Sequence, residues 1–156
     1  MEIPEAKLIK SEIVLRDMDL SDEVKMTRKA LVRWLALSLG LISKRESRQS
    51  ILSVLEALMY YHLKEKREPN YQDLVDYFQK NNVQMNEKTI RYHLTQLRKS
   101  GVLEEDRGIY RFAGFHYDNL SSALQASYQK RAHTAFFNIS HAINELERMF
   151  QEEKTE

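Results

Sequence analysis

The chain has 156 residues, with 24 Lys and Arg against 23 Asp and Glu, and its net charge at pH 7 is +1. This length suits one ordinary domain with an added element, or two very small domains. The sequence contains no Cys, which excludes disulfide bonds and thiolate metal sites. It also has no run of about 20 apolar residues and no signal-peptide pattern, so we expect a cytoplasmic protein that does not enter membranes.

The composition predicts a mainly helical protein, because only 4 Gly and 2 Pro occur among many Leu, Lys, Glu and Arg. The charges are unevenly distributed. Basic residues outnumber acidic ones in residues 21–50 and 81–112, and acidic residues are in excess elsewhere. Nucleic-acid-binding proteins often confine basic charge to one surface, so the small net charge does not exclude that function. It does argue against strong, indiscriminate binding.

The N-terminal part predicts two elements. Residues 1–20 form an extension in which the alternation around Ile13 and Leu15 indicates a short strand over residues 12–16. Residues 21–44 predict a helix that Ser21 or Asp19 caps and that ends near residue 42. Its apolar second half requires burial against the rest of the chain or a second subunit. Its first half carries cations that either form a solvated flank or contact phosphates, namely Lys25, Arg28, Lys29 and Arg33.

Two further helices follow. Apolar residues at helical spacing predict a helix from residue 51 to about residue 64, with Leu55 and Leu58 on its apolar face. Asn70 then caps a helix over residues 71–80. Tyr60 and Tyr61, like Trp34 before them, lie among Leu and Met, which is typical of core positions. A ligand pocket between the N-terminal helix and the tail is the less favoured alternative for these aromatic residues.

A third helix, over residues 86–100, has the clearest limits and two different faces. Asn86 is a suitable N-cap and Gly101 supplies a left-handed stop. Ile90, Leu94 and Leu97 make an apolar stripe. The opposite face carries cations and hydrogen-bonding groups, which are Lys88, Arg91, Tyr92, Thr95 and Lys99. Such a face can contact phosphates and base edges.

Residues 102–105 and 109–112 predict two short strands of a hairpin, and Gly108 between them can take the positive φ of a bulged turn. The succession of three helices and a hairpin, joined by Leu94, Leu97, Gly101, Val102 and Leu103, resembles the winged helix-turn-helix family of transcription regulators. The resemblance covers residues 48–113, and we place the domain at residues 45–113.

The resemblance implies that the third helix enters the major groove of double-stranded DNA and that the hairpin, as a wing, follows the backbone or reaches the minor groove. The residues it implies as contacts are Lys88, Thr89, Arg91, Tyr92, Thr95 and Lys99 on the helix, and Arg107 and Arg111 on the wing. The wing departs from this pattern because Glu104, Glu105 and Asp106 are acidic and repel phosphates. A purely structural hairpin therefore stays an alternative.

The C-terminal part, residues 114–156, predicts a long helix from Leu120 to Glu152. Ala132, Ala135, Ile139, Ala142, Leu146 and Met149 recur at alternating spacings of three and four, and Phe136, Ile143 and Phe150 widen this seam. The helix either lies back on its own domain or pairs with a second copy. Its length, about 50 Å at 1.5 Å per residue, favours a homodimer in which the N-terminal helix also takes part.

We find no pattern that predicts an enzyme, a cofactor or a metal site. The five His form no close metal-binding pair, and neither a nucleophile motif nor a Gly-rich phosphate loop is present. We therefore predict a sequence-specific regulator of transcription that binds double-stranded DNA as a homodimer and is associated with the nucleoid. The alternative is a winged-helix protein-interaction module in a transcription or chromosome-maintenance assembly, and the basic outer face of residues 86–100 favours DNA.

Overall fold

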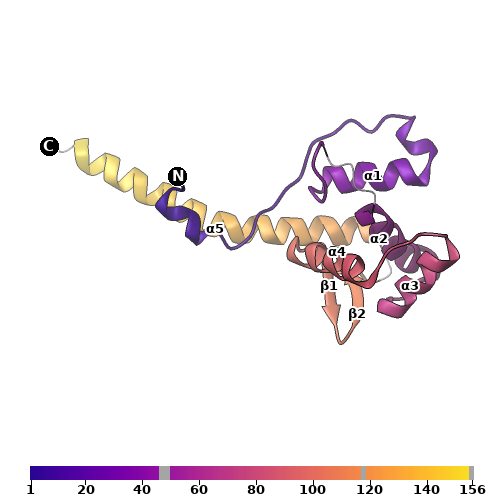
Figure 1. Cartoon of the computed structure of the whole chain (residues 1–156). Coiled ribbons are helices and arrows are strands. Elements are labelled where there is room, and N and C mark those ends of the chain that lie inside the picture. The colour runs from indigo at the N-terminus through magenta and orange to yellow at the C-terminus, as the bar shows by residue number, and fades with distance from the viewer. Residues whose placement is uncertain (46–49, 117–118, 155–156) are drawn as a thin grey trace.

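The computed structural model describes residues 1–45, 50–116 and 119–154. In chain order, its elements are η1 (Pro4–Leu8), η2 (Val24–Met26), α1 (Arg28–Ser38), α2 (Ser50–Met59), η3 (Tyr60–Glu65), α3 (Tyr71–Lys80), α4 (Glu87–Lys99), β1 (Leu103–Asp106), β2 (Ile109–Phe112) and α5 (Leu120–Lys154). The predicted mainly helical chain with one small β-hairpin is confirmed (Figure 1). Within the described residues, no helix is both long and apolar enough to cross a membrane.

Helix α2 is the centre of the core. It packs against α1, α3 and α4, and its side chains are buried on nearly all sides. Val54, Ala57 and Leu58 have no exposed surface at all. The helix continues into η3, one stretch of π-helix, and ends where Lys66 takes a left-handed conformation with φ 59°. A helix so completely buried requires apolar faces from each of its neighbours, which sets how they are arranged.

Asn70 begins α3 as predicted and also helps to hold the hairpin. Its side chain accepts from the Asp73 N–H, while the Asp73 carboxylate accepts from the Asn70 N–H, both at 2.9 Å. This reciprocal capping box fixes the start of the helix. The Tyr110 N–H of β2 donates to the Pro69 carbonyl at 2.9 Å, and Asn70 forms a bridge with Ile109. The segment before α3 thus lies along β2 as a third extended segment.

The hairpin has a tighter turn than the bulged one we predicted. Asp106 pairs directly with Ile109, which leaves a two-residue loop of Arg107 and Gly108. Both loop residues have positive φ, 54° and 81°. This is the backbone conformation of a type I′ turn, whose twist matches that of the flanking strands, so no bulge is needed.

The N-terminal region differs from two predictions. Residues 12–16 are not a strand, because they pair with neither strand of the hairpin. Instead, the Arg16 guanidinium donates to the carbonyl of Leu37 in the last turn of α1 and to that of Ile42 beyond its end. The predicted helix over residues 21–42 is divided at Thr27. The Thr27 hydroxyl accepts from the Ala30 N–H at 3.1 Å and starts α1, while the Ser21 hydroxyl accepts from the Val24 N–H at 3.3 Å, where the short η2 begins.

Helix α5 belongs to the domain at one end only. Leu120, Ala123 and Leu124 are partly buried against the core, and Tyr128 is 7% exposed. From His133 to Glu153 every side chain is exposed. Figure 1 shows the second half of this helix extending away from the other elements of the domain. Among the described residues, none therefore covers the long apolar face of this helix.

We predict that His62 makes the fold sensitive to acid. Its side chain has no exposed surface, and this burial lowers its pKa below the ordinary value of 6.5. The unfolded chain therefore takes up a proton that the folded chain resists. The free energy of unfolding should be highest above pH 6.5 and should fall below it, by at most about 1.4 kcal/mol per pH unit for one group.

Urea denaturation at pH values from 7.5 to 5 measures this dependence, and the His62→Gln variant should show a flatter profile. His116→Gln, at an exposed position, is the matched control and should keep the profile of the unaltered chain. Identical profiles for both variants would show that His62 does not carry the effect.

Candidate nucleic-acid interface

The orientation of α4 is fixed by its cap and its buried face. The Asn86 side chain accepts from the Thr89 N–H at 2.8 Å, and Gly101 follows the helix with φ 84°. Ile90, Leu94 and Leu97 are each at most 2% exposed. His93 is also buried, with Nε2 lying 2.7 Å from the Ser50 hydroxyl of α2. The opposite face of α4 is therefore turned to solvent.

This outer face carries most of the residues that the sequence indicated. Lys88, Arg91, Tyr92, Thr95 and Lys99 are all exposed. Thr89 is half-buried, and its backbone N–H is used by the cap, so it is less accessible than the other five. The exposed face also includes Arg98, which our sequence analysis left out. Arg98 is seven residues after Arg91, a spacing that returns to the same side of a helix and could have identified it.

Arg91 is held by two neighbours. Its Nε donates to the Glu87 carboxylate at 2.8 Å, and its guanidinium lies 4.1 Å from the centre of the Tyr71 ring. The hydrogen bond that Arg91 donates to Glu87 is the main reason that the pKa of Arg91 is raised. This pair restrains the guanidinium at the outer face, but Glu87 also competes with any anion that Arg91 is to bind.

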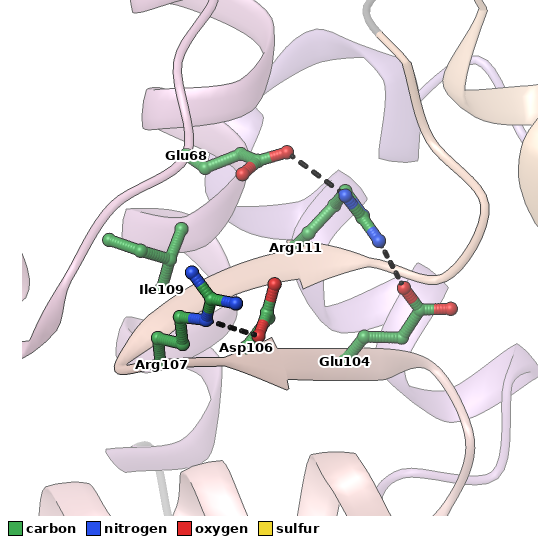
Figure 2. A pocket seen from close by; sticks show the side chains of 6 residues that line it. All are labelled: Glu68, Glu104, Asp106, Arg107, Ile109 and Arg111. Atoms are coloured by element: carbon green, nitrogen blue, oxygen red, sulfur yellow. Dashed lines mark hydrogen bonds and ion pairs between the residues drawn. The ribbon is translucent and has the colours of Figure 1, made fainter.

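The two arginines of the hairpin have different surroundings, which Figure 2 shows in the pocket that they line with Glu68, Glu104, Asp106 and Ile109. The Arg111 guanidinium lies between two carboxylates, 2.8 Å from Glu104 and 3.4 Å from Glu68. These contacts join β2 to β1 and to the segment before α3. Arg107 lies at the tip, 94% exposed, and among the described acidic residues only its neighbour Asp106 lies within ion-pair distance, at 3.8 Å.

The predicted backbone contacts in the N-terminal region lie elsewhere. Lys25 precedes α1, and Arg28, Lys29 and Arg33 are on α1, which packs against α2. Figure 1 shows α1 on the side of the domain away from the hairpin. Arg28 is paired with Glu56 of α2 at 2.7 Å. The structure does not bring these cations together with the outer face of α4 in one surface.

The C-terminal end of α4 is connected to α5. The Arg131 guanidinium donates to the Ser100 carbonyl and lies 4.2 Å from the centre of the Tyr128 ring. A Cβ atom at Gly101 would come within 2.6 Å of this guanidinium, so Gly101 permits the close approach as well as the positive φ. The position of α4 is thus coupled to the helix that leaves the domain.

Among residues 1–45, 50–116 and 119–154, no group of three or more His, Asp or Glu is placed to hold a metal ion. Comparisons with models of protein families, with curated proteins and with solved structures gave no match.

We predict that Arg111 stabilises the fold and that Arg107 does not. Arg111→Ala removes hydrogen bonds to two carboxylates, both partly exposed, and should lower the free energy of unfolding by about 1 kcal/mol. Arg107→Ala, the matched control on the same hairpin, should change it by less than about 0.5 kcal/mol. Urea denaturation of both variants decides this, and equal stabilities would mean that the Arg111 ion pairs do not support the hairpin.

Proposed function

We propose that α2 to β2 form a winged-helix domain and that the chain binds double-stranded DNA as a sequence-specific regulator of transcription. The observation that carries this proposal is the outer face of α4, where four cations, Lys88, Arg91, Arg98 and Lys99, are exposed beside Tyr92 and Thr95. An α-helix fits the major groove of B-DNA, and these side chains match phosphates, guanine edges and the thymine methyl. The neighbouring α2 and β1 pack against this helix and hold it at the surface.

The hairpin and the segment before α3 support the winged-helix proposal. In such a domain, a small sheet follows the third helix, and here β2 lies between β1 and residues 69–70. The hairpin tip offers one exposed cation, Arg107, beside the acidic Asp106. We therefore assign most of the binding to α4 and a lesser, backbone-directed role to the tip.

Binding as a homodimer completes the proposal. The exposed half of α5 carries large apolar side chains, including Phe136, Ile143 and Phe150 with exposed fractions of 59%, 56% and 63%. A run of this kind on a single helix is unusual for a monomer and typical of an interface. A two-fold dimer presents two copies of α4 to the DNA, which predicts a pseudo-palindromic binding site.

We expect salt-dependent binding of mixed-sequence duplex DNA that requires α4. Lys88→Ala should reduce affinity on all sequences and lower the salt slope by about one, as the loss of one phosphate contact does. Arg91→Ala should reduce affinity by about tenfold or more on a selected site and relax the preference at one base pair. Fluorescence anisotropy at several salt concentrations measures these effects. Lys7→Ala, an exposed cation of η1, is the control and should bind as the unaltered chain does.

An absence of binding at about 50 mM salt would overturn the proposal, because the counterion effect is then at its most favourable. That result would favour the protein-interaction module instead. An equal loss for Arg91→Ala on every sequence would assign Arg91 to a phosphate rather than a base.

We also predict that Glu87 weakens DNA binding. Its carboxylate holds Arg91 at 2.8 Å and lies on the same exposed end of α4. Glu87→Gln should release the guanidinium, remove a repulsion with phosphates and raise affinity severalfold. Glu23→Gln makes the same change of net charge far along the chain from α4 and should leave affinity nearly unchanged. If both variants gained equally, the effect would be one of net charge alone.

A further inference from the structure

The exposed part of α5 has a continuous apolar stripe. From Ala132 onward, Phe136, Ile139, Ile143, Leu146 and Phe150 recur at alternating spacings of four and three, which is the a/d pattern of a coiled coil. Those five large side chains are between 44% and 63% exposed. Toward the domain, the next two a/d positions are occupied by the polar residues Gln125 and Gln129, which are also exposed. The domain packs on a different side of the helix, through Leu124 and Tyr128, and leaves the stripe uncovered.

We propose that two copies of the chain pair through residues 129–153 of α5, and that the two helices run antiparallel. In this register Ala132 lies opposite Phe150 of the second copy, Phe136 opposite Leu146, and Ile139 opposite Ile143, and the two-fold axis passes near residue 141. The inference rests on the proposed homodimer and specifies its interface and orientation.

The sizes of the side chains favour this direction. In an antiparallel pair the smallest residue of the stripe, Ala132, faces one of the largest, Phe150, at both ends of the interface. In a parallel pair each residue faces its own copy, so that two Ala132 side chains leave a gap and two Phe150 side chains crowd one layer. Cores lose stability from both kinds of mismatch. Beside the stripe, the antiparallel register also places Ala135 opposite Met149.

The register follows from the ends of the stripe. A shift of one heptad in one direction places Phe136 opposite the charged Glu153. A shift in the other direction places Phe150 opposite Gln125. Each shift buries a large aromatic side chain against a polar one, which is unfavourable. In the proposed register, Gln129 and Glu153 face each other at the margin of the interface, where water still hydrates both side chains.

The charges along α5 support the same direction. Residues 120–141 contain Lys130 and Arg131 and no acidic residue. Residues 142–154 contain four Glu against Arg148 and Lys154. A parallel pair aligns the acidic halves with each other, whereas an antiparallel pair aligns each acidic half with a basic one. Complementary charges select the partner and orientation of coiled coils in this way.

A specific pair lies at the border of the antiparallel interface. His133 and Glu147 both flank the stripe on the same side, and the proposed register brings His133 of each copy opposite Glu147 of the other. Within the described chain both side chains are exposed, and neither forms an ion pair. In a parallel pair, the register places His133 beside Tyr128 instead, so this contact distinguishes the two directions.

Spin labels at two equivalent positions test the direction. The chain contains no Cys, so Asn144→Cys and Gln151→Cys each accept a single label. These positions are one heptad apart and on the outside of the proposed pair. The antiparallel arrangement offsets the two labels along the helix axis by about 9 Å at residue 144 and by about 30 Å at residue 151. Double electron–electron resonance should therefore give a clearly longer distance for Gln151→Cys.

Equal distances at both positions would overturn the antiparallel proposal in favour of a parallel pair. The absence of dipolar coupling, with a monomeric mass by sedimentation, would overturn the pairing altogether. Both measurements are made without DNA. A failure here is thus distinguishable from a failure of DNA binding, which the anisotropy experiment measures on the same labelled chains.

A charge exchange tests the flanking pair. His133→Glu places two acidic side chains together in the antiparallel dimer only, and it should raise the dimer dissociation constant about fivefold. Adding Glu147→Lys should restore the affinity, because the two introduced side chains have opposite charges. Glu145→Lys in place of Glu147→Lys is the control and should restore less. No change for His133→Glu, measured by sedimentation equilibrium, would contradict the proposed register.

Discussion

The burial of one face of α4 against α2 is the constraint on which the rest of the domain depends. Ile90, Leu94 and Leu97 are almost completely buried, so the helix cannot rotate without exposing large apolar side chains to water. The cations on the other side need no packing of their own to stay at the surface. A helix that is fixed by its core face and charged on its outer face is therefore preorganised for the binding that we propose, and it has little conformational freedom left to lose in such a complex.

The hairpin contains two arginines whose surroundings differ. Arg111 and Arg107 lie four residues apart in sequence, but one is enclosed by two carboxylates and the other lies at an open tip. A cation that is already paired gains less from a phosphate than a free one, since it must first give up its partner. The acidic charge of the hairpin thus has a partly structural explanation. Glu104 and Glu68 connect the hairpin to the domain through Arg111.

The sequence predicted the elements whose signals are local. The caps Asn70 and Asn86, the stop at Gly101 and the apolar stripe of α4 depend only on residues within a few positions, and each is present in the structure. The prediction of a strand over residues 12–16 was wrong because a strand requires a neighbouring strand, and the structure places none beside these residues. Likewise, nothing near Arg111 in sequence indicated Glu68, which is distant along the chain. Contacts of this kind determine which candidate cations are already paired with carboxylates and which are available to bind an anion.

The connection between α4 and α5 relates the proposed dimer to the proposed function. Arg131 joins α5 to the end of α4 through the Ser100 carbonyl. In an antiparallel pair, residue 131 lies opposite Gln151 of the second copy, so the two Arg131 side chains are separated along the axis by twenty residues of helix, or about 30 Å. One turn of B-DNA is about 34 Å. In a parallel pair there is no such axial offset, and the spacing depends on the width of the domains alone. In the proposed antiparallel dimer, the length of the paired segment thus sets the distance between the two proposed half-sites.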